Sequence, residues 1–222
     1  MFSGSSLPSQ ARCSLYHLPS NSSSIIQDIE AISNTGSAHI AYFFFDFKDK
    51  AKQDPRALLC SLVVQLSHQS KSFCNILSGY HSSHQSGSRQ PSDRTLTQCL
   101  EDMLSVPGQP PTYLIVDALD ECPKTTGIPS SREKALTLVK KLVKLNLPNL
   151  RLCITSRPEI DIRTSLEPLT SNCISIHDQS GQKQDIIDFV TSVVYSDENM
   201  RRWRDEDKKM VIETLSERAD GM

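Results

Sequence analysis

Three carboxylates follow directly on a short apolar segment in the middle of the chain. Residues 113–116 are Tyr, Leu, Ile and Val; Asp117 follows immediately, and Asp120 and Glu121 come after two small or apolar residues. An apolar run of this length with β-branched members predicts a strand buried on both faces of a parallel sheet. Unpaired charges are costly to bury, but the carboxyl ends of parallel strands face the crevice where α/β proteins bind ligands. Mg²⁺ bound to phosphate oxygens would stabilise carboxylates placed there.

A second polar group follows the next predicted strand. Residues 150–156 form another mostly apolar run, and it leads directly into Arg157 and Pro158. A guanidinium at this point can contact a γ-phosphate, or it can pair with Asp120 or Glu121 at the end of an adjacent strand. The two runs are separated by one crossover with a helix of ordinary length, as parallel strands require. The alternative interpretations are an acidic surface turn and a surface arginine that caps a loop.

Composition and charge restrict the classes of protein to which the chain can belong. The 222 residues suffice for one or two domains with a sizeable core. The formal net charge of −2 does not support a nucleic-acid or membrane-surface role. No apolar run approaches the length of a membrane span, and the first residues lack the features of a signal peptide. The seven cysteines are dispersed, which is typical of reduced intracellular thiols. We therefore expect an intracellular, cytoplasmic protein without nucleic-acid or membrane partners.

Predicted strands and helices alternate along most of the chain. Residues 13–18 are a weak candidate strand, and clearer apolar strands cover residues 38–47, 113–117, 150–156 and 173–177. Amphipathic helices are predicted over residues 24–33, 54–69, 72–77, 92–104, 131–145 and 160–166. This alternation predicts an α/β fold with a doubly wound parallel sheet. Two further helices, over residues 182–194 and 205–218, predict a small helical appendage.

A polar segment interrupts this pattern after the third helix. Residues 78–92 are rich in serine and contain two glycines and a proline, so we expect an exposed loop there. His81 and His84 have a spacing that could bind a metal. No Cys, Asp or Glu ligand lies nearby in the sequence, and we therefore interpret both histidines as part of a solvated loop.

The two chemistry-bearing segments resemble motifs of one family. Residues 114–121 resemble the Walker B segment, and residues 151–158 the sensor-1 strand, of NACHT signalling ATPases, which are STAND-class P-loop NTPases. The fungal proteins with a nephrocystin-3-like N-terminal domain are the most similar group. The resemblance implies a P-loop NTPase-like fold with Mg²⁺ and ATP or GTP as ligands. It further implies that Asp117 orients Mg²⁺, that Asp120 or Glu121 polarises the attacking water, and that Arg157 senses the γ-phosphate.

The phosphate-binding loop of that family, G-x-x-x-x-G-K-S/T, is missing. The first lysine of the chain is Lys48, and the expected position, residues 18–24, is rich in serine and asparagine. Backbone N–H groups at a helix start can attract an anion, but they replace neither the lysine charge nor the glycine conformations of the loop. The strand before this loop normally lies in the middle of the sheet. Either residues 13–18 fill that position poorly, or the sheet is incomplete at its N-terminus.

These observations predict three regions and one main function. The regions are an irregular Ser/Pro-rich lead (1–23), a NACHT-like α/β domain (24–181) and the truncated start of a helical subdomain (182–222). The predicted function is a nucleotide-dependent signalling and assembly module, degenerate for ATP hydrolysis, that associates with protein partners or with itself. The alternatives are a nucleotide-free adaptor that acts through protein–protein contacts and an unrelated α/β metal hydrolase. The last of these lacks a nucleophile motif such as G-x-S-x-G.

Overall fold

A five-stranded sheet forms the centre of the first of two compact units. The computed structural model describes residues 12–17, 22–83, 90–124, 127–175 and 182–218. Contacts divide the chain into Met1–Ile174 and Ser175–Met222, and each unit is described by itself. The strands are β1 (Arg12–His17), β2 (His39–Phe44), β3 (Thr112–Asp117), β4 (Leu150–Thr155) and β5 (Asn172–Ser175). Their order across the sheet is β2-β3-β4-β1-β5.

The weakly predicted first strand occupies an interior position of this sheet. β1 pairs in parallel with β4, with Tyr16 opposite Thr155, and it lies between β4 and β5. The pairs β2–β3 and β3–β4 are also parallel. Of the two alternatives that the sequence leaves for this position, the structure therefore takes the first, in which the early segment is a strand. Arg12–His17 thus belongs to the sheet, although the predicted division places it in the irregular lead.

Six α-helices connect the strands of this unit. They are α1 (Ser22–Ser33), α2 (Pro55–Ser67), α3 (Lys71–Ser83), α4 (Asp93–Leu104), α5 (Ser131–Lys144) and α6 (Ile160–Leu166). Three of them begin with strong local signals. Asp54 caps α2 ahead of a proline, Ser92 caps α4, and Ser130 forms a capping box with Glu133 at the start of α5.

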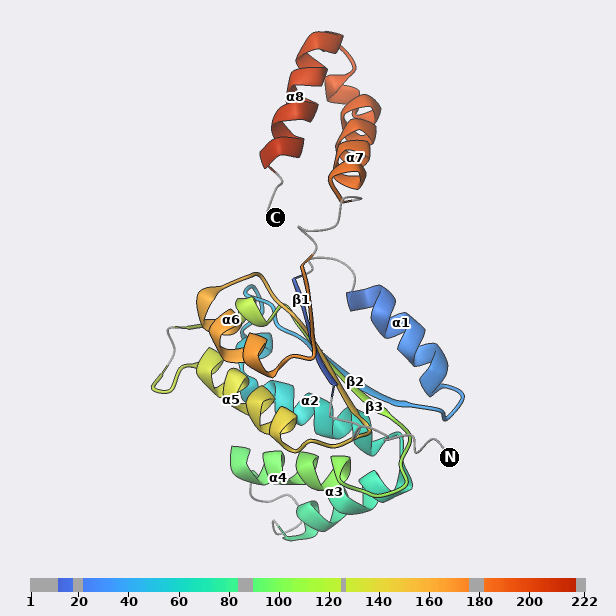
Figure 1. The fold of residues 1–222 in the computed structure, drawn as a ribbon, viewed down its shortest axis with the longest axis vertical. Helices are drawn as coiled ribbons and strands as arrows, with labels where there is room; N and C mark the ends of the chain where they lie inside the picture. Colours follow the sequence, from blue (N-terminus) through green and yellow to red (C-terminus); the bar gives the residue numbers. More distant parts are fainter. Residues whose placement is uncertain (1–11, 18–21, 84–89, 125–126, 176–181, 219–222) are drawn as a thin grey trace, which may run out of the picture. The chain divides into compact units, whose positions relative to one another are not determined.

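The strand order sends these helices to both faces of the sheet. From β1 to β2 the chain moves past β4 and β3 in one direction, and from β2 onward it moves back in the other. Because parallel crossovers are right-handed, the two directions place their helices on opposite faces. Figure 1 shows α1 on one side of the strands and α2, α5 and α6 on the other. The predicted doubly wound α/β fold is confirmed.

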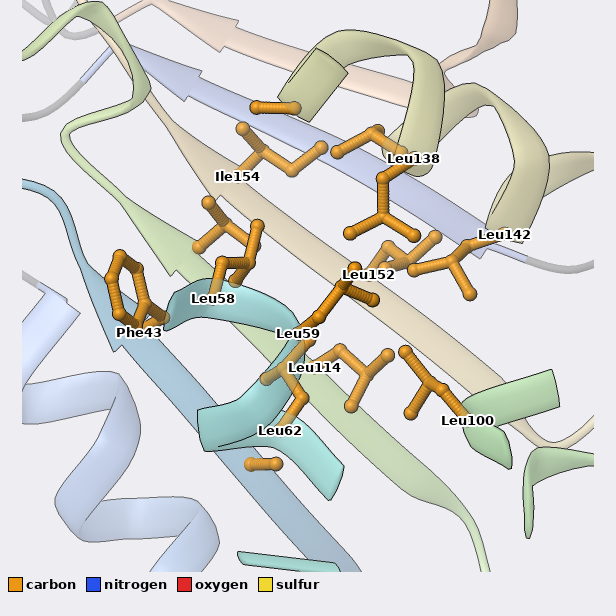
Figure 2. Close-up of a cluster of buried hydrophobic side chains, with 14 of the residues drawn as sticks. Phe43, Leu58, Leu59, Leu62, Leu100, Leu114, Leu138, Leu142, Leu152 and Ile154 are labelled. Atoms are coloured by element: carbon orange, nitrogen blue, oxygen red, sulfur yellow. The ribbon is translucent and has the colours of Figure 1, made fainter. Parts of the chain in front are cut away.

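The larger core lies between the sheet and the helices α2, α4 and α5. Figure 2 shows its centre, where buried side chains of the strands meet those of the helices: Phe43, Leu58, Leu59, Leu62, Leu100, Leu114, Leu138, Leu142, Leu152 and Ile154. A smaller cluster lies on the opposite face, where Ile26 of α1 packs on Ile40 and Ile115. β3 supplies buried residues to both faces, as a central strand of a doubly wound sheet must.

The structure corrects the prediction for the polar segment after the third helix. α3 continues to Ser83, so residues 78–83 are helical rather than part of a loop. Phe73 of this helix is fully buried in the larger core. The Tyr80 hydroxyl donates a hydrogen bond to Asp102 of α4 at 2.7 Å. These two contacts hold a helix whose composition is otherwise that of a loop. His81 lies on this helix, and His84 lies outside the described residues.

The second unit contains two helices that pack against each other, α7 (Gln182–Ser196) and α8 (Asp205–Arg218). The Lys208 ammonium group of α8 lies 5.1 Å from the centre of the Tyr195 ring of α7. Several large apolar side chains of this unit are exposed: Phe189, Val193, Tyr195, Trp203, Met210 and Leu215. Across the described part of both units, no helix is long and apolar enough to cross a bilayer.

Candidate functional site

The predicted site residues gather at the edge of the sheet where β3 and β4 end. The two strands are parallel neighbours, so their carboxyl ends lie at the same edge. Asp117 is the last residue of β3 and Thr155 the last of β4. The Thr155 hydroxyl donates a hydrogen bond to Oδ1 of Asp117 and accepts one from the Ala118 N–H at 2.9 Å. A β4 side chain therefore fixes both the Asp117 carboxylate and the backbone that follows it.

A sharp turn after β3 directs the next two carboxylates. Ala118 has a left-handed backbone conformation with φ of 51°, which is unusual for a residue with a side chain. The 3₁₀ turn Leu119–Glu121 follows, and Leu119 is fully buried in the larger core. Non-glycine residues in this conformation cost about 1–2 kcal/mol and persist where the surroundings impose them. Here the buried leucine and the Thr155 hydrogen bond supply that constraint.

Asp120 pairs with the arginine that follows β4. Its Oδ1 accepts a hydrogen bond from the Arg157 backbone N–H at 3.0 Å, and its Oδ2 lies 3.4 Å from Nε of Arg157. The Asp120 side chain is 8% exposed, whereas the Arg157 side chain is 74% exposed. The structure therefore brings these two predicted residues together and leaves most of the guanidinium in solvent.

Glu121 reaches toward the neighbouring strand on the other side. Its Oε2 accepts a hydrogen bond from the backbone N–H of Phe47, three residues past the end of β2, at 3.0 Å. The acids after β3 thus connect to the ends of both flanking strands. Within the described parts of the chain, no group of three or more His, Cys, Asp or Glu side chains is placed to hold a metal by itself.

One residue that supports this site, Arg132 of α5, is not among those predicted from the sequence. Its side chain is buried, and its Nε donates a hydrogen bond to the Cys122 carbonyl at 2.8 Å. Its terminal nitrogens donate to the Asp120 carbonyl and to the Glu159 carboxylate. A signal existed in the sequence, because Arg132 shares the helical spacing of the buried apolar residues of α5, namely Ala135, Leu136, Val139 and Leu142. A charge at a core position needs partners, and these are the carbonyls that follow β3.

Further charges complete the arrangement around Arg132. The Lys124 ammonium group lies 2.5 Å from Glu159 and 3.1 Å from Asp161. Burial alone would raise the pKa of both carboxyls, but hydrogen bonds and charges from Lys124 and Arg132 lower them below their ordinary values. The hydrogen bonds that Lys124 donates to the same two carboxylates raise the pKa of its ammonium group. All four groups are therefore charged at neutral pH, and they join the segment after β3 to the start of α6.

The nearby thiol is not suited to chemistry. Cys122 is fully buried, and burial raises the pKa of its thiol to about 12, although the Arg132 charge acts in the opposite direction. A thiol that remains protonated is a poor nucleophile and a poor metal ligand. The chemistry of this edge therefore rests on the carboxylates and on Arg157.

Comparison with solved structures finds only distant similarity. The structure of Drosophila ORC bound to DNA has a TM-score of 0.38 and 15% identity, over 74% of this chain and 79% of that chain. Drosophila ORC bound to GC-rich DNA and Cdc6 gives a TM-score of 0.39 and 12% identity, over 95% and 75%. The pCW3 conjugation coupling protein TcpA, in its monomer form with ATPgS, gives 0.36 and 18%, over 79% and 51%. No curated protein sequence matches the chain.

Comparison with protein families gives a specific match. Residues 21–157 match the family described as Nephrocystin 3, N-terminal. The matched segment covers more than half of the chain and contains Asp117, Asp120, Glu121 and Arg157. This result confirms the family resemblance that the sequence motifs predict, and the TM-scores below 0.5 play no part in the assignment. The chain belongs to the nephrocystin 3 N-terminal family.

Proposed function

We propose that this protein is a NACHT-type, nucleotide-dependent assembly module with its ligand site at the carboxyl edge of β3 and β4. The observation that carries the proposal is the pair of contacts Asp117–Thr155 and Asp120–Arg157 at the ends of two adjacent parallel strands. Ligands of doubly wound sheets bind outside the carboxyl ends of the strands, at the point where crossovers change face. In this sheet that point lies between β4 and β1, because α1 and α6 lie on opposite faces.

The residues at this edge fit a complex of Mg²⁺ with a nucleotide phosphate. Mg²⁺ commonly takes one or two carboxylates together with phosphate oxygens and water, so it needs no cluster of three acids. Asp117 would hold the metal through a carboxylate that Thr155 already orients. The exposed guanidinium of Arg157 would contact the terminal phosphate. When bound, Mg²⁺ would neutralise charge on the phosphates. ATP and GTP both carry the triphosphate that this site would bind.

The two remaining acids differ in what they can do at this site. The Asp120 carboxylate is nearly buried and contacts both the N–H and the guanidinium of Arg157, which suits a positioning residue. Glu121 is bound to backbone through Oε2, and we assign to it the role of polarising water. The segment before α1 has neither the lysine nor the glycines of a phosphate-binding loop. Phosphoryl transfer depends on positioning and charge stabilisation. Hydrolysis should therefore be slow, and nucleotide would act mainly as a switch ligand.

A thermal titration of the purified chain with Mg²⁺–ATP, repeated with Mg²⁺–GTP, tests this proposal. A ligand that binds only the folded state at a hundred times its Kd adds about 2.7 kcal/mol of stability. For a protein of this size that corresponds to a rise in Tm of roughly 5–10 °C. Asp117→Asn should abolish the rise. Asp28→Asn, which changes an exposed carboxylate on α1, should retain it. A folded chain that shows no rise with either nucleotide, or the same rise in Asp117→Asn, would overturn the proposal.

The second candidate is a nucleotide-free adaptor, and one observation favours it. The α7–α8 unit exposes large apolar side chains, including Phe189 and Met210, that are typical of protein-binding surfaces. On this view the helices α7 and α8 contact other proteins. The two candidates differ in the titration, because an adaptor of this kind gains no stability from Mg²⁺–ATP or Mg²⁺–GTP.

A further inference from the structure

The outer edge of β2 has backbone groups that a neighbouring strand would normally satisfy. β2 is the first strand in the sheet order, so only one of its edges pairs with β3. The N–H groups of His39 and Phe45 point to the β3 side, where they bond to Pro111 and Asp117 at 2.8 and 3.1 Å. Alternate residues of a strand direct their backbone groups to opposite sides. Hence the backbone N–H and C=O groups of Ile40 and Tyr42 point outward, away from β3.

Two glutamine side chains, Gln65 of α2 and Gln69 in the turn directly after this helix, bond to these outward groups. Oε1 of Gln65 accepts from the Tyr42 N–H at 3.1 Å, and its Nε2 donates to the Tyr42 carbonyl at 2.7 Å. Gln69 makes the same pair with Ile40, at 2.9 and 2.6 Å. Each side-chain amide therefore makes with one residue the pair of bonds that a residue of an added antiparallel strand would make. The backbone partners also fix which end of each amide is oxygen and which is nitrogen.

The repeat of the pattern follows from the geometry of a helix packed along a strand. Four residues of helix advance about 6.0 Å, and two residues of strand advance about 6.6 Å. Gln69 lies two residues past the end of α2, but His68 between them keeps a helical backbone conformation. Glutamines four positions apart can therefore bond to strand residues two positions apart. Nε2 of Gln65 also donates to Ser61 Oγ at 2.7 Å, and Nε2 of Gln69 to the Gln65 carbonyl at 2.9 Å. These additional bonds hold the two amides in place.

The protected segment is one that would self-associate if it were open. Residues 39–45 are His, Ile, Ala, Tyr and three Phe, with no proline, no glycine and no Asp, Glu, Lys or Arg. Segments with high β-propensity and little charge form cross-strand assemblies when they are exposed at a sheet edge. Within the described residues, no further strand pairs with this edge. The glutamines therefore cover the place where such an assembly would start.

We infer that Gln65 and Gln69 close a strand-addition surface on the outer edge of β2, and that the partner which fits the opened surface is β2 of a second copy of this chain. The inference rests on the eight backbone and side-chain atoms that make these four hydrogen bonds and on the uncharged aromatic composition of β2. It is independent of the proposed nucleotide site.

Amide hydrogen exchange in the double variant Gln65→Ala/Gln69→Ala tests the first half of the inference. Alanine is a strong helix former, so α2 itself is not weakened. Exchange at Ile40 and Tyr42 should accelerate about tenfold, which is the scale of one lost hydrogen bond. Ala41 and Phe43, whose amides face β3, should stay protected. Gln98→Ala provides the matched control, because Gln98 is exposed on α4 and bonds only to the Asp102 side chain at 2.9 Å.

Light scattering after size-exclusion chromatography tests the second half. The double alanine variant should form dimers and larger species with rising concentration, while the wild-type chain and Gln98→Ala should not. Gln65→Lys/Gln69→Lys should open the edge in the exchange experiment but stay monomeric, because lysines at an edge block strand addition. If the double variant does not fold, Gln69→Ala alone is used. Amide hydrogen exchange at Ile40, whose backbone Gln69 contacts, is then the deciding measurement. Unchanged exchange, a uniform rise at all four amides, or an alanine variant that stays monomeric would overturn the inference.

Discussion

The two faces of the sheet are covered very differently, although β3 contributes to both. On one face, α2, α4 and α5 enclose a large apolar core that includes Leu114 (Figure 2). On the other face, α1 covers a small cluster in which Ile115 packs with Ile26 and Ile40. Apolar burial is the main stabilising contribution to folding, at about 25 cal/mol per Å². The first face therefore supplies most of the stability, whereas α1 is the helix that packs on the second face within the described part of this unit.

This difference bears on the proposed function because its candidate residues belong to the firmly packed part of the sheet. Asp117 ends β3 and Arg157 follows β4, and both strands supply residues to the large core. The helix α1 packs on the smaller cluster. A ligand that contacts α1 as well as these residues would gain most of its effect by fixing α1, which a thermal titration would detect.

Adjacent residues of β3 provide the largest test of this comparison. Leu114→Ala should lower the free energy of unfolding by about 4 kcal/mol, and Ile115→Ala by about 2–3 kcal/mol. Both side chains are fully buried. The difference is expected because α1 alone can shift into the space left by Ile115, whereas three helices fix the space around Leu114. Urea unfolding of each variant measures both values.

The matched control for this pair is Val64→Ala, which truncates a β-branched side chain on the exposed surface of α2. It should change the free energy of unfolding by less than about 0.5 kcal/mol. If Ile115→Ala costs as much as Leu114→Ala or more, then α1 is held as firmly as the helices of the other face, and the comparison fails.

A smaller effect is expected from Arg132→Met, which removes the buried charge that joins α5 to the turn after β3. The variant leaves the Asp120 and Cys122 carbonyls without their donor, while Glu159 keeps Lys124. Breaking a buried ion pair by removing one partner costs about 3–5 kcal/mol. Since one partner is retained here, we expect about 2–3 kcal/mol in urea unfolding.

Arg163→Met is the corresponding control, because Arg163 forms an exposed pair with Glu167 on the same side of the sheet. It should cost less than about 0.5 kcal/mol. If both variants lose the same free energy of unfolding, Arg132 contributes no more stability than an ordinary surface ion pair. The contrast between the two faces would then rest on apolar packing alone.

The smallest effect is a loss of stability in acid from the same group of charges. Glu159 and Asp161 have pKa values lowered below their ordinary values of 4.5 and 3.8. A lowered pKa contributes stability that is complete above the ordinary value and disappears as the pH falls through the folded value. The free energy of unfolding should therefore decline below about pH 4.5. Glu159→Gln should decline less steeply over this range. If the free energy of unfolding falls equally steeply with pH in the wild-type chain and in Glu159→Gln, Glu159 does not contribute to the loss of stability in acid.

Much of this fold was predictable because local signals agree with the tertiary structure. α2, α4 and α5 begin at capping residues followed by apolar periodicity, and the structure places their starts at the predicted residues. β3 and β4 are apolar runs that end in charges, and their parallel pairing brings Asp120 to Arg157. The edge location of the candidate site therefore followed from the strand order implied by alternating elements.

The parts that were missed depend on contacts between segments far apart in sequence. The C-terminal half of α3, residues 78–83, has a composition that favours a loop, and it is held by the hydrogen bond from Tyr80 to Asp102 of α4. Gln65 and Gln69 have the spacing of an ordinary polar helix face, and their role is evident only from their hydrogen bonds to β2. The position of Arg132 among the buried apolar residues of α5 indicates a buried side chain, but its charge argues for a surface position.

The left-handed conformation of Ala118 has a consequence for how the site behaves on warming. Glycine adopts this conformation freely, but an alanine must be held in it by its surroundings. The surroundings are Leu119 in the core and the Thr155 hydroxyl, so the geometry of Asp120 and Glu121 depends on how tightly the core is packed. As the core loosens below the melting temperature, the turn can relax toward a more common conformation. The acidic edge would then lose its shape before the sheet loses its strands.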